Sequence, residues 1–217
     1  ALDDVDSDDN NIYECSDNDE DGCEDCSSGT YNTADDGADA NNDGMCDLGD
    51  VSLELHAGAN SISFFALPAN GDFSVSNIFG DDGNVAKVFG EGVIAYNSGS
   101  NGWIGYLTDV EADDGYWAIL NEDAALQVTG LPTAPVSYQV HTGNNFLSYS
   151  YSDGQSIGNA LPGDAADNTA YIYAEASAAI NVGGDTGWAG SLEGFEGGKG
   201  YWFGANTNFV FEYNVPA

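Results

Sequence analysis

Residues 51–217 consist of short runs of alternating apolar and polar residues, separated by turns rich in Gly, Asp and Asn. Alternation with a period of two places successive side chains on opposite faces of a strand. The pattern predicts strands over 51–57, 61–67, 84–89, 92–96, 115–120, 125–129, 136–142, 146–151, 170–174, 178–182, 200–204 and 209–214. It also predicts two short helices, at 74–79 and 155–161, because each follows a Gly-Asp or Asp-Gly turn and has a Ser near its start.

The same motifs occur twice, at a constant spacing along the chain. Leu-His-Ala-Gly-Ala-Asn-Ser-Ile-Ser-Phe at 55–64 is matched by Val-His-Thr-Gly-Asn-Asn-Phe-Leu-Ser-Tyr at 140–149. The other matched motifs are Gly-Trp-x-Gly-x-Leu at 102–107 and 187–192, and Gly-Tyr-Trp at 115–117 and 200–202. A duplicated segment is expected to fold twice in the same way. We therefore predict an all-β protein with two tandem, related β-sandwich-like domains, 51–133 and 134–217.

Residues 1–50 carry a different pattern, in which oxygen-bearing side chains recur at alternate positions. In residues 39–50 they fall at loop positions 1, 3, 5, 9 and 12, and Gly44 stands at position 6, where a calcium loop turns sharply. Calcium takes about six to eight oxygen ligands, which alternate residues of a tight loop can supply. The predicted ligands, in three such units, are Asp4, Asp6, Asp8, Asp17, Asp19, Asp21, Asp25, Asp39, Asn41, Asp43, Asp47 and Asp50.

All four cysteines lie in this acidic segment: Cys15, Cys23, Cys26 and Cys46. Their clustering favours local disulfide bonds and an oxidising compartment, with Cys15–Cys23 and Cys26–Cys46 as the simplest of the pairings. A zinc site is the alternative, because Cys23 and Cys26 form a Cys-x-x-Cys pair. For the whole segment the alternative is a disordered acidic tail, since its 18 carboxylates have no Lys or Arg among them. Bound divalent cations and two disulfides would offset that repulsion, so we predict an irregular, disulfide-tied calcium-binding segment.

Residues 3–50 resemble the thrombospondin type 3 and dockerin-type calcium repeats of extracellular proteins, and the loop at 39–50 is closest to the dockerin form. The resemblance implies calcium ligation. It does not imply cohesin binding, because a dockerin loop leads into a helix, whereas residues 51–56 alternate like a strand. The Gly-Trp-x-Gly-x-Leu and Gly-Tyr-Trp motifs resemble β repeats of secreted bacterial surface proteins.

The chain is strongly acidic, with 37 Asp and Glu against Lys87 and Lys199, no Arg, and a formal net charge of −35. This excludes nucleic acid as a partner, because phosphate binding requires Lys and Arg. No apolar run is long enough to span a bilayer as a helix, so no membrane insertion is predicted. Because the chain begins at Ala1, it fits a secreted form whose leader has been removed, and we expect an extracellular or cell-surface protein.

Histidines and tryptophans recur at equivalent positions of the two halves. His56 and His141 have no nucleophile motif beside them, so we expect structural histidines hydrogen-bonded to a neighbouring turn, and no enzyme. The four tryptophans are Trp103, Trp117, Trp188 and Trp202. Recurrence favours packing residues, and stacking on sugars is the alternative.

These observations predict a secreted calcium-binding structural protein, a subunit of an extracellular filament or surface layer that binds copies of itself head to tail. The alternative is a carbohydrate-binding or adhesin module of a larger extracellular protein, with glycans as partners. A third hypothesis is a fragment of a calcium-dependent hydrolase, because 37 acids leave room for a catalytic carboxylate pair.

Overall fold

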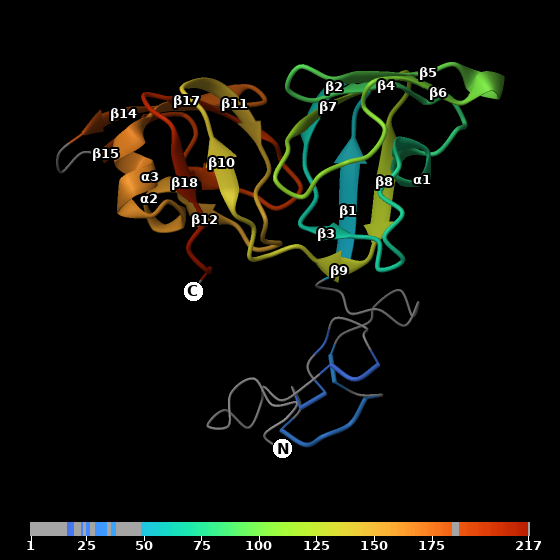
Figure 1. The fold of residues 1–217 in the computed structure, drawn as a ribbon, viewed down its shortest axis with the longest axis horizontal. Helices are drawn as coiled ribbons and strands as arrows, with labels where there is room; N and C mark the ends of the chain where they lie inside the picture. The colour runs from blue at the N-terminus through green and yellow to red at the C-terminus, as the bar shows by residue number, and fades with distance from the viewer. Residues whose placement is uncertain are drawn as a thin grey trace.

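The computed structural model describes residues 17–19, 23, 25–26, 29–33, 36–37, 49–183 and 187–216. Antiparallel strands and three short helices make up its regular structure, so the all-β prediction is confirmed. None of the helices in these ranges is long and apolar enough to cross a membrane. The described parts of residues 17–37 lie apart from the sheets, on the side of β9 (Leu131–Pro132) (Figure 1).

The first half contains the strands up to β9 and one helix. Its other elements are β1 (Asp50–Leu55), β2 (Gly58–Ile62), β3 (Ala66–Leu67), α1 (Val75–Phe79), β4 (Val85–Phe89), β5 (Ile94–Asn97), the 3-10 turn η2 (Gly99–Asn101), β6 (Trp103–Gly105), β7 (Tyr116–Leu120) and β8 (Ala124–Thr129). A five-stranded sheet has the order β2-β7-β4-β5-β6, and the pairs β1-β8 and β3-β9 pack below it (Figure 1). The helix predicted at 74–79 is α1, and the Ser74 hydroxyl accepts the Asn77 N–H at its start.

The second half repeats the large sheet of the first and the strand pair that begins and ends it. Its elements are β10 (Tyr138–Val140), β11 (Gly143–Leu147), β12 (Gln155–Ser156), α2 (Ile157–Ala160), α3 (Gly163–Asn168), β13 (Thr169–Ala174), β14 (Ser177–Gly183), β15 (Gly187–Gly190), β16 (Gly194–Phe195), β17 (Tyr201–Ala205) and β18 (Phe209–Phe211). Its five-stranded sheet has the order β11-β17-β13-β14-β15, beside the pairs β10-β18 and β12-β16. The duplicated motifs occupy equivalent strands of the two large sheets, with Trp-x-Gly on β6 and β15 and Tyr-Trp on β7 and β17.

Each half has its own apolar core beneath its large sheet. In the first, Phe64, Tyr116 and Val88 are buried, and in the second Phe203, Tyr201 and Ile172. The two buried tyrosines sit at equivalent positions and form equivalent hydrogen bonds. The Tyr116 hydroxyl accepts the Glu111 N–H at 2.7 Å, and the Tyr201 hydroxyl accepts the Glu196 N–H at 2.7 Å. Each bond fixes the loop that precedes its strand.

The strand pattern missed several elements. β6 and β15 contain the Gly-Trp-x-Gly motifs, whose glycines hide the alternation, and α3 has no apolar stripe that a helix pattern would show. The strand predicted at 61–67 is two strands, because residues 63–65 leave the sheet.

Trp103 on β6 packs against Phe79, and its indole N–H donates to the Gly80 carbonyl at 2.9 Å. This tryptophan is therefore a packing residue.

The two halves meet along the edge strands β2 and β11, and the contacts are reciprocal. The Ser63 N–H donates to the Gly198 carbonyl at 3.0 Å, and the Ser148 N–H donates to the Asp113 carbonyl at 3.0 Å. Residues 63 and 148 are equivalent in the repeat, and so are 113 and 198. An edge strand has backbone groups without sheet partners, and here loops of the opposite half supply them. The two repeats therefore form one body through an intrachain interface.

An aromatic row crosses this interface. The Phe146 ring is buried, stacked on Trp202 with ring centroids 4.6 Å apart and planes at 5°, and it lies 6.1 Å from the Trp117 ring of the first half. Aromatic pairs at these distances add about 0.5–1.5 kcal/mol beyond the area they bury. Trp117 and Trp202 occupy equivalent positions on β7 and β17, so the Gly-Tyr-Trp motif places a tryptophan on each side of the interface.

Both histidines lie at the same interface. The His56 Nε2 is 2.8 Å from the Glu175 carboxylate of the second half, and the His141 Nε2 is 2.7 Å from the Glu91 carboxylate of the first. Each ring Nδ1 contacts a backbone carbonyl, that of Ala57 or Thr142. The expectation of a structural role fits these contacts, but the partner carboxylates come from the opposite repeat, which sequence spacing does not show.

Candidate metal centre

The described parts of the acidic segment are held by hydrogen bonds between residues 18 and 25–32. The Asn18 N–H donates to the Asp25 side chain at 3.1 Å, and the Asn32 N–H donates to the Asp25 carbonyl at 2.7 Å. The Asn18 side-chain amide donates to the Tyr31 hydroxyl at 2.8 Å, and the Gly29 N–H closes a turn on the Cys26 carbonyl. These bonds bring two stretches of chain together around Asp25.

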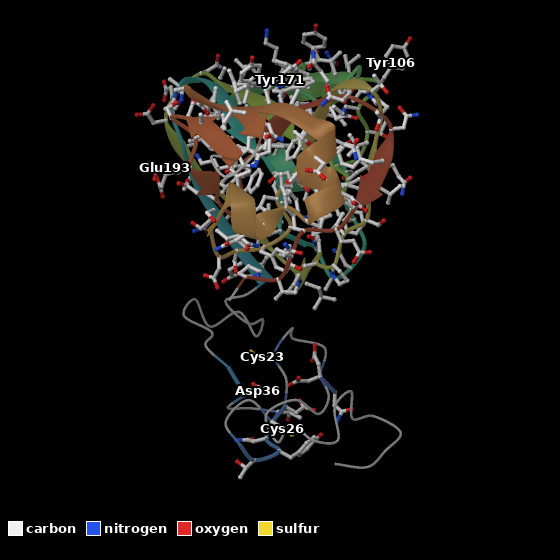
Figure 2. All side chains as sticks on the ribbon, turned by 90° about the vertical axis from the view of Figure 1, so that its left-hand side faces the viewer. Cys23, Cys26, Asp36, Tyr106, Tyr171 and Glu193 are labelled. Atoms are coloured by element: carbon white, nitrogen blue, oxygen red, sulfur yellow. The ribbon has the colours of Figure 1, made fainter. Side chains whose placement is uncertain are left out.

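Three carboxylates converge at this point. Asp19, Asp25 and Asp36 each offer an oxygen, and these oxygens all lie within 4.8 Å of one another. Asp25 is 0% exposed and Asp36 is 5% exposed, whereas Asp19 faces solvent. Figure 2 shows Asp36, Cys23 and Cys26 on the side of the molecule opposite to Tyr106 and Tyr171. The cluster is therefore a partly enclosed group of oxygen ligands with one open side.

The electrostatics of this cluster favour a bound cation. Two unit charges about 4 Å apart repel by about 1 kcal/mol in water and by about 4 kcal/mol at an effective dielectric constant near 20. Burial of Asp25 and Asp36 moves their carboxylates toward the second regime. A divalent ion between the three groups would convert this repulsion into attraction, and oxygen is the ligand atom that hard cations select. The arrangement could hold a metal ion.

The structure brings together two of the ligands predicted from the sequence and adds a third. Asp19 and Asp25 belong to the predicted set, and Asp36 does not. The sequence signal for Asp36 was Asp35-Asp36-Gly37, an acidic pair before glycine between two predicted loops. Such a site depends on which loops the chain brings together, and spacing within one loop does not reveal it.

The remaining predicted ligands fall into two groups. Asp17 is described and half-buried, and Asp50 begins β1, where its carboxylate accepts the Thr129 hydroxyl at 2.9 Å. The others lie outside the described residues: Asp4, Asp6, Asp8, Asp21, Asp39, Asn41, Asp43 and Asp47. The calcium loop at 39–50 therefore stays a prediction.

The two described cysteines belong to the same acidic segment as the cluster, and Cys26 follows Asp25 directly in the chain. Cys23 and Cys26 are buried, and neither is a free thiol. No disulfide bond joins two of the described residues, and Cys15 and Cys46 lie outside them. The pairing of the four cysteines therefore stays a prediction.

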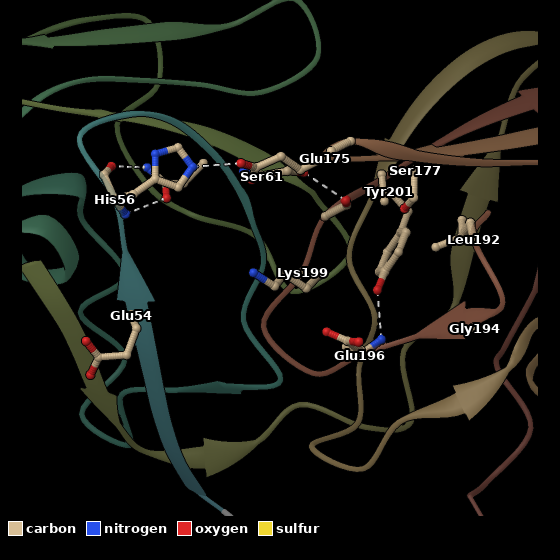
Figure 3. A pocket seen from close by; sticks show the side chains of 14 residues that line it. Glu54, His56, Ser61, Glu175, Ser177, Leu192, Gly194, Glu196, Lys199 and Tyr201 are labelled. Carbon is tan, nitrogen blue, oxygen red and sulfur yellow. Dashed lines mark hydrogen bonds and ion pairs between the residues drawn. The ribbon is translucent and has the colours of Figure 1, made fainter. Parts of the chain in front are cut away.

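A second candidate region is a cavity of about 300 Å³ between the repeats (Figure 3). Its charged lining residues are Glu54, His56, Glu175, Glu196 and Lys199. His56 and Glu175 bond to each other across the interface, and the Glu196 backbone is held by the Tyr201 hydroxyl. These contacts give His56, Glu175 and Tyr201 a structural role, because they hold the two repeats together or fix a loop. The prediction that the chain is not an enzyme is not tested by them and stays a prediction.

The chain matches no protein-family model, no curated protein and no solved structure. The resemblance to thrombospondin type 3, dockerin-type and Gly-Trp repeats therefore continues to rest on the residues alone.

Proposed function

We propose that this chain is a secreted calcium-binding structural protein, in which the acidic segment is folded around calcium and the β repeats form a rigid body. The observation that carries the proposal is the convergence of Asp19, Asp25 and Asp36, two of them buried, in a segment without Lys or Arg. Calcium–oxygen distances are about 2.3–2.6 Å, so two ligands on opposite sides of one ion lie about 5 Å apart. A spread within 4.8 Å suits that ion.

The assembly part of the proposal is a subunit of an extracellular filament or surface layer. The strong negative charge disfavours nucleic acid and anionic surfaces as partners. The described acidic segment lies on one side of the molecule and the large sheets lie on the other, so the chain presents two unlike ends (Figure 1). Contact between unlike ends generates open filaments when it does not close into a ring. Copies would thus join head to tail.

Two disulfides within residues 15–46 belong to the same proposal. The burial of Cys23 and Cys26, neither of which is a free thiol, supports them. Mass spectrometry of the protein digested without reduction, by an acidic-residue protease, is expected to find no alkylated cysteine. Recovery of four alkylated cysteines together with bound zinc would contradict the disulfides and favour the zinc site.

A calorimetric titration of the full chain with calcium tests the metal site. Asp36→Asn keeps the size of the side chain and removes one charge from the cluster, and we expect at least about a tenfold weaker affinity for one site. Asp164→Asn, in the exposed first turn of α3, removes the same charge elsewhere and is the matched control. Absence of calcium heat, or equal loss in the two variants, would rule out the centre.

Carbohydrate binding is a second candidate function. Trp103 and Trp188 pack on the cores of their repeats, but Trp117 and Trp202 lie half-buried on the outward faces of β7 and β17. Ring faces that reach solvent can stack on sugars. Retention of the protein on insoluble cellulose or chitin, with loss of retention in Trp117→Ala and Trp202→Ala, would favour this function over the structural one.

A further inference from the structure

The outward side chains of both five-stranded sheets include no Asp and no Glu. In the first sheet, the strand register pairs these outward residues with one another across neighbouring strands, and along each strand they alternate with the residues that face the core. They are Ala59, Ser61, Lys87, Phe89, Ile94, Tyr96, Ile104, Trp117 and Ile119. In the second they are Asn144, Phe146, Tyr171, Tyr173, Ala178, Ile180, Val182, Ala189, Trp202 and Gly204. Phe146 and Ser61 are buried where the two repeats meet. We call these residues the outer face.

The two halves of the outer face are continuous. Trp117 of the first sheet and Trp202 of the second flank Phe146 at 6.1 and 4.6 Å. Figure 1 shows β14, β17 and β11 beside β2, β4 and β5 along one side of the molecule. The face therefore spans both repeats, and the reciprocal contacts of β2 and β11 hold its two halves together.

Large apolar side chains of this face are exposed to solvent. Ile104 is 56% exposed, Ile180 55% and Val182 54%, and Tyr106, which follows β6, is 90% exposed. Contiguous exposed apolar surface on a protein marks a contact site. Lys87 also lies on this face and is one of the two lysines of a chain that has no Arg.

The charge distribution narrows the choice of partner. A surface that only meets water is free to carry carboxylates, and this chain has 37 acidic residues. Burying an unpaired carboxylate in a contact costs several kcal/mol, so an acid-free face is what a buried contact requires. A partner surface that presents carboxylates to this face would leave them unpaired, because Lys87 is the single cationic residue among the outward strand residues. The partner surface is therefore neutral and apolar.

We propose that two copies of this chain pack outer face against outer face. Branched aliphatic and aromatic side chains on a twisted sheet pack well against a second such sheet, about 10 Å away. A second copy supplies a face of matching size whose strand residues include no acid, and the two carboxylates at the junction of the repeats, Glu175 and Glu91, are already paired with His56 and His141. Trp117, Phe146 and Trp202 belong both to the interface between the repeats and to the outer face. A contact between two outer faces would therefore be continuous with the interface between the repeats. The contact joins like faces and is therefore isologous, so the inference goes beyond the proposed head-to-tail joint, does not rest on it and does not involve the acidic segment.

Sedimentation velocity of the full chain tests the contact. We expect a monomer–dimer equilibrium that strengthens when salt is raised to about 0.5 M, because the screening length then falls to roughly 4 Å and like-charge repulsion weakens. Ile104→Asp is expected to weaken the dimer by at least about tenfold. Val210→Asp is the matched control, because Val210 is also 56% exposed but lies on β18, outside the outer face. Circular dichroism of both variants checks that the fold is intact.

The outcomes separate this contact from the metal site and from sugar binding. A wild-type chain that stays monomeric in high salt, or equal weakening by Ile104→Asp and Val210→Asp, overturns the proposal. A monomer that is retained on insoluble cellulose or chitin, and loses retention in Ile104→Asp but not in Val210→Asp, also overturns it and assigns the face to glycans. Dimers of the wild-type chain that give no heat on titration with calcium support the contact while contradicting the metal part of the proposed function.

Discussion

His56 and Glu175 join the two repeats across their interface. The His56 Nε2 lies 2.8 Å from one Glu175 oxygen, and the other Glu175 oxygen accepts the Ser61 N–H at 2.9 Å. His141 and Glu91 reproduce this arrangement at 2.7 Å, with the Phe146 N–H as the second donor. Each carboxylate comes from the turn after β4 or β13 of the opposite half. The contacts are reciprocal, as in an isologous dimer, although both partners belong to one chain.

These pairs predict that the inter-repeat contact depends on pH. The backbone carbonyl of Ala57 and the Glu175 carboxylate raise the pKa of His56, and Thr142 and Glu91 do the same for His141. The resulting stability is fully present below the unfolded histidine pKa of 6.5 and is lost as pH rises through the raised value. Burial would raise the pKa of Glu175, but the bonds from His56 and Ser61 lower it, so its contribution is lost only as pH falls below about 4.5.

The pairs are therefore expected to contribute most between about pH 4.5 and 6.5. Replacing both histidines with Gln should lower the melting temperature more at about pH 5.5 than at about pH 8. Differential scanning calorimetry of the variant and the parent chain, at both pH values, measures the difference. An equal loss at the two pH values would show that charge on the histidines does not hold the interface.

A second pH effect is expected from Asp114, whose ionisation destabilises the folded state, in contrast to the charged histidine pairs, which stabilise it. Burial raises the pKa of its carboxyl to about 6, with further contributions from the charges of Asp113, Glu111 and Glu91. The folded state is therefore penalised for ionising Asp114 above about pH 6, and the penalty is absent below the unfolded value of 3.8. Asp114→Asn should stabilise the protein above pH 6 by about 1–2 kcal/mol, after allowing for solvent screening.

Urea unfolding at about pH 7.5 and pH 4 measures this effect. Asp153→Asn, which removes an exposed carboxylate, is the control and should change stability by less than about 0.5 kcal/mol. Stabilisation by Asp114→Asn that is as large at pH 4 as at pH 7.5 would contradict an electrostatic cause.

Removal of calcium is expected to destabilise the acidic segment. An ion bound only by the folded form stabilises it by about 3–4 kcal/mol at a few hundred times its dissociation constant. Limited proteolysis by an acidic-residue protease should therefore cut residues 1–50 much faster in chelator than in calcium, while the repeats resist. The same cleavage rate with and without chelator would contradict a folded, metal-bound segment.

Gly105 and Gly190, the last residues of the two Gly-Trp-x-Gly motifs, are predicted to be required for the fold of their repeats. Gly105 has a φ of +154°, and a Cβ there would lie 2.1 Å from the Ile94 carbonyl oxygen. Gly190, its equivalent, has a φ of +152° and the same distance to the Ala178 carbonyl. Gly105→Ala and Gly190→Ala should each cost about 2 kcal/mol or more.

Gly158→Ala is the control for these substitutions, because Gly158 lies in α2 with nothing within 4 Å of an added Cβ. It should be neutral or slightly stabilising, by the higher helix propensity of Ala. Chemical denaturation of the three variants measures the costs. Full tolerance of Ala at both 105 and 190 would mean that the tight approach of β6 and β15 to their neighbours is not required.

Much of the β architecture was predictable from the sequence because it depends on local patterns. Alternation with a period of two located β4, β5, β7 and β8, and the constant spacing of the duplicated motifs showed that the second half repeats the first. The Ser before residues 75–79 marked the start of α1. β6 and β15 escaped this method, since a strand of Gly and Trp shows no alternation and is formed by pairing with β5 or β14.

The sequence by itself determined that alternate residues of each strand face opposite sides and that acidic side chains crowd the amino-terminal segment, because both properties are set by short stretches of chain. Only the tertiary structure decided that Asp36 joins Asp19 and Asp25, that Glu175 meets His56 from the opposite repeat, and that the outward strand residues of the two sheets form one surface. These relationships depend on how whole sheets dock. The free energy of docking is the total of small packing and hydrogen-bond energies from many residues, so it cannot be predicted from any single sequence motif.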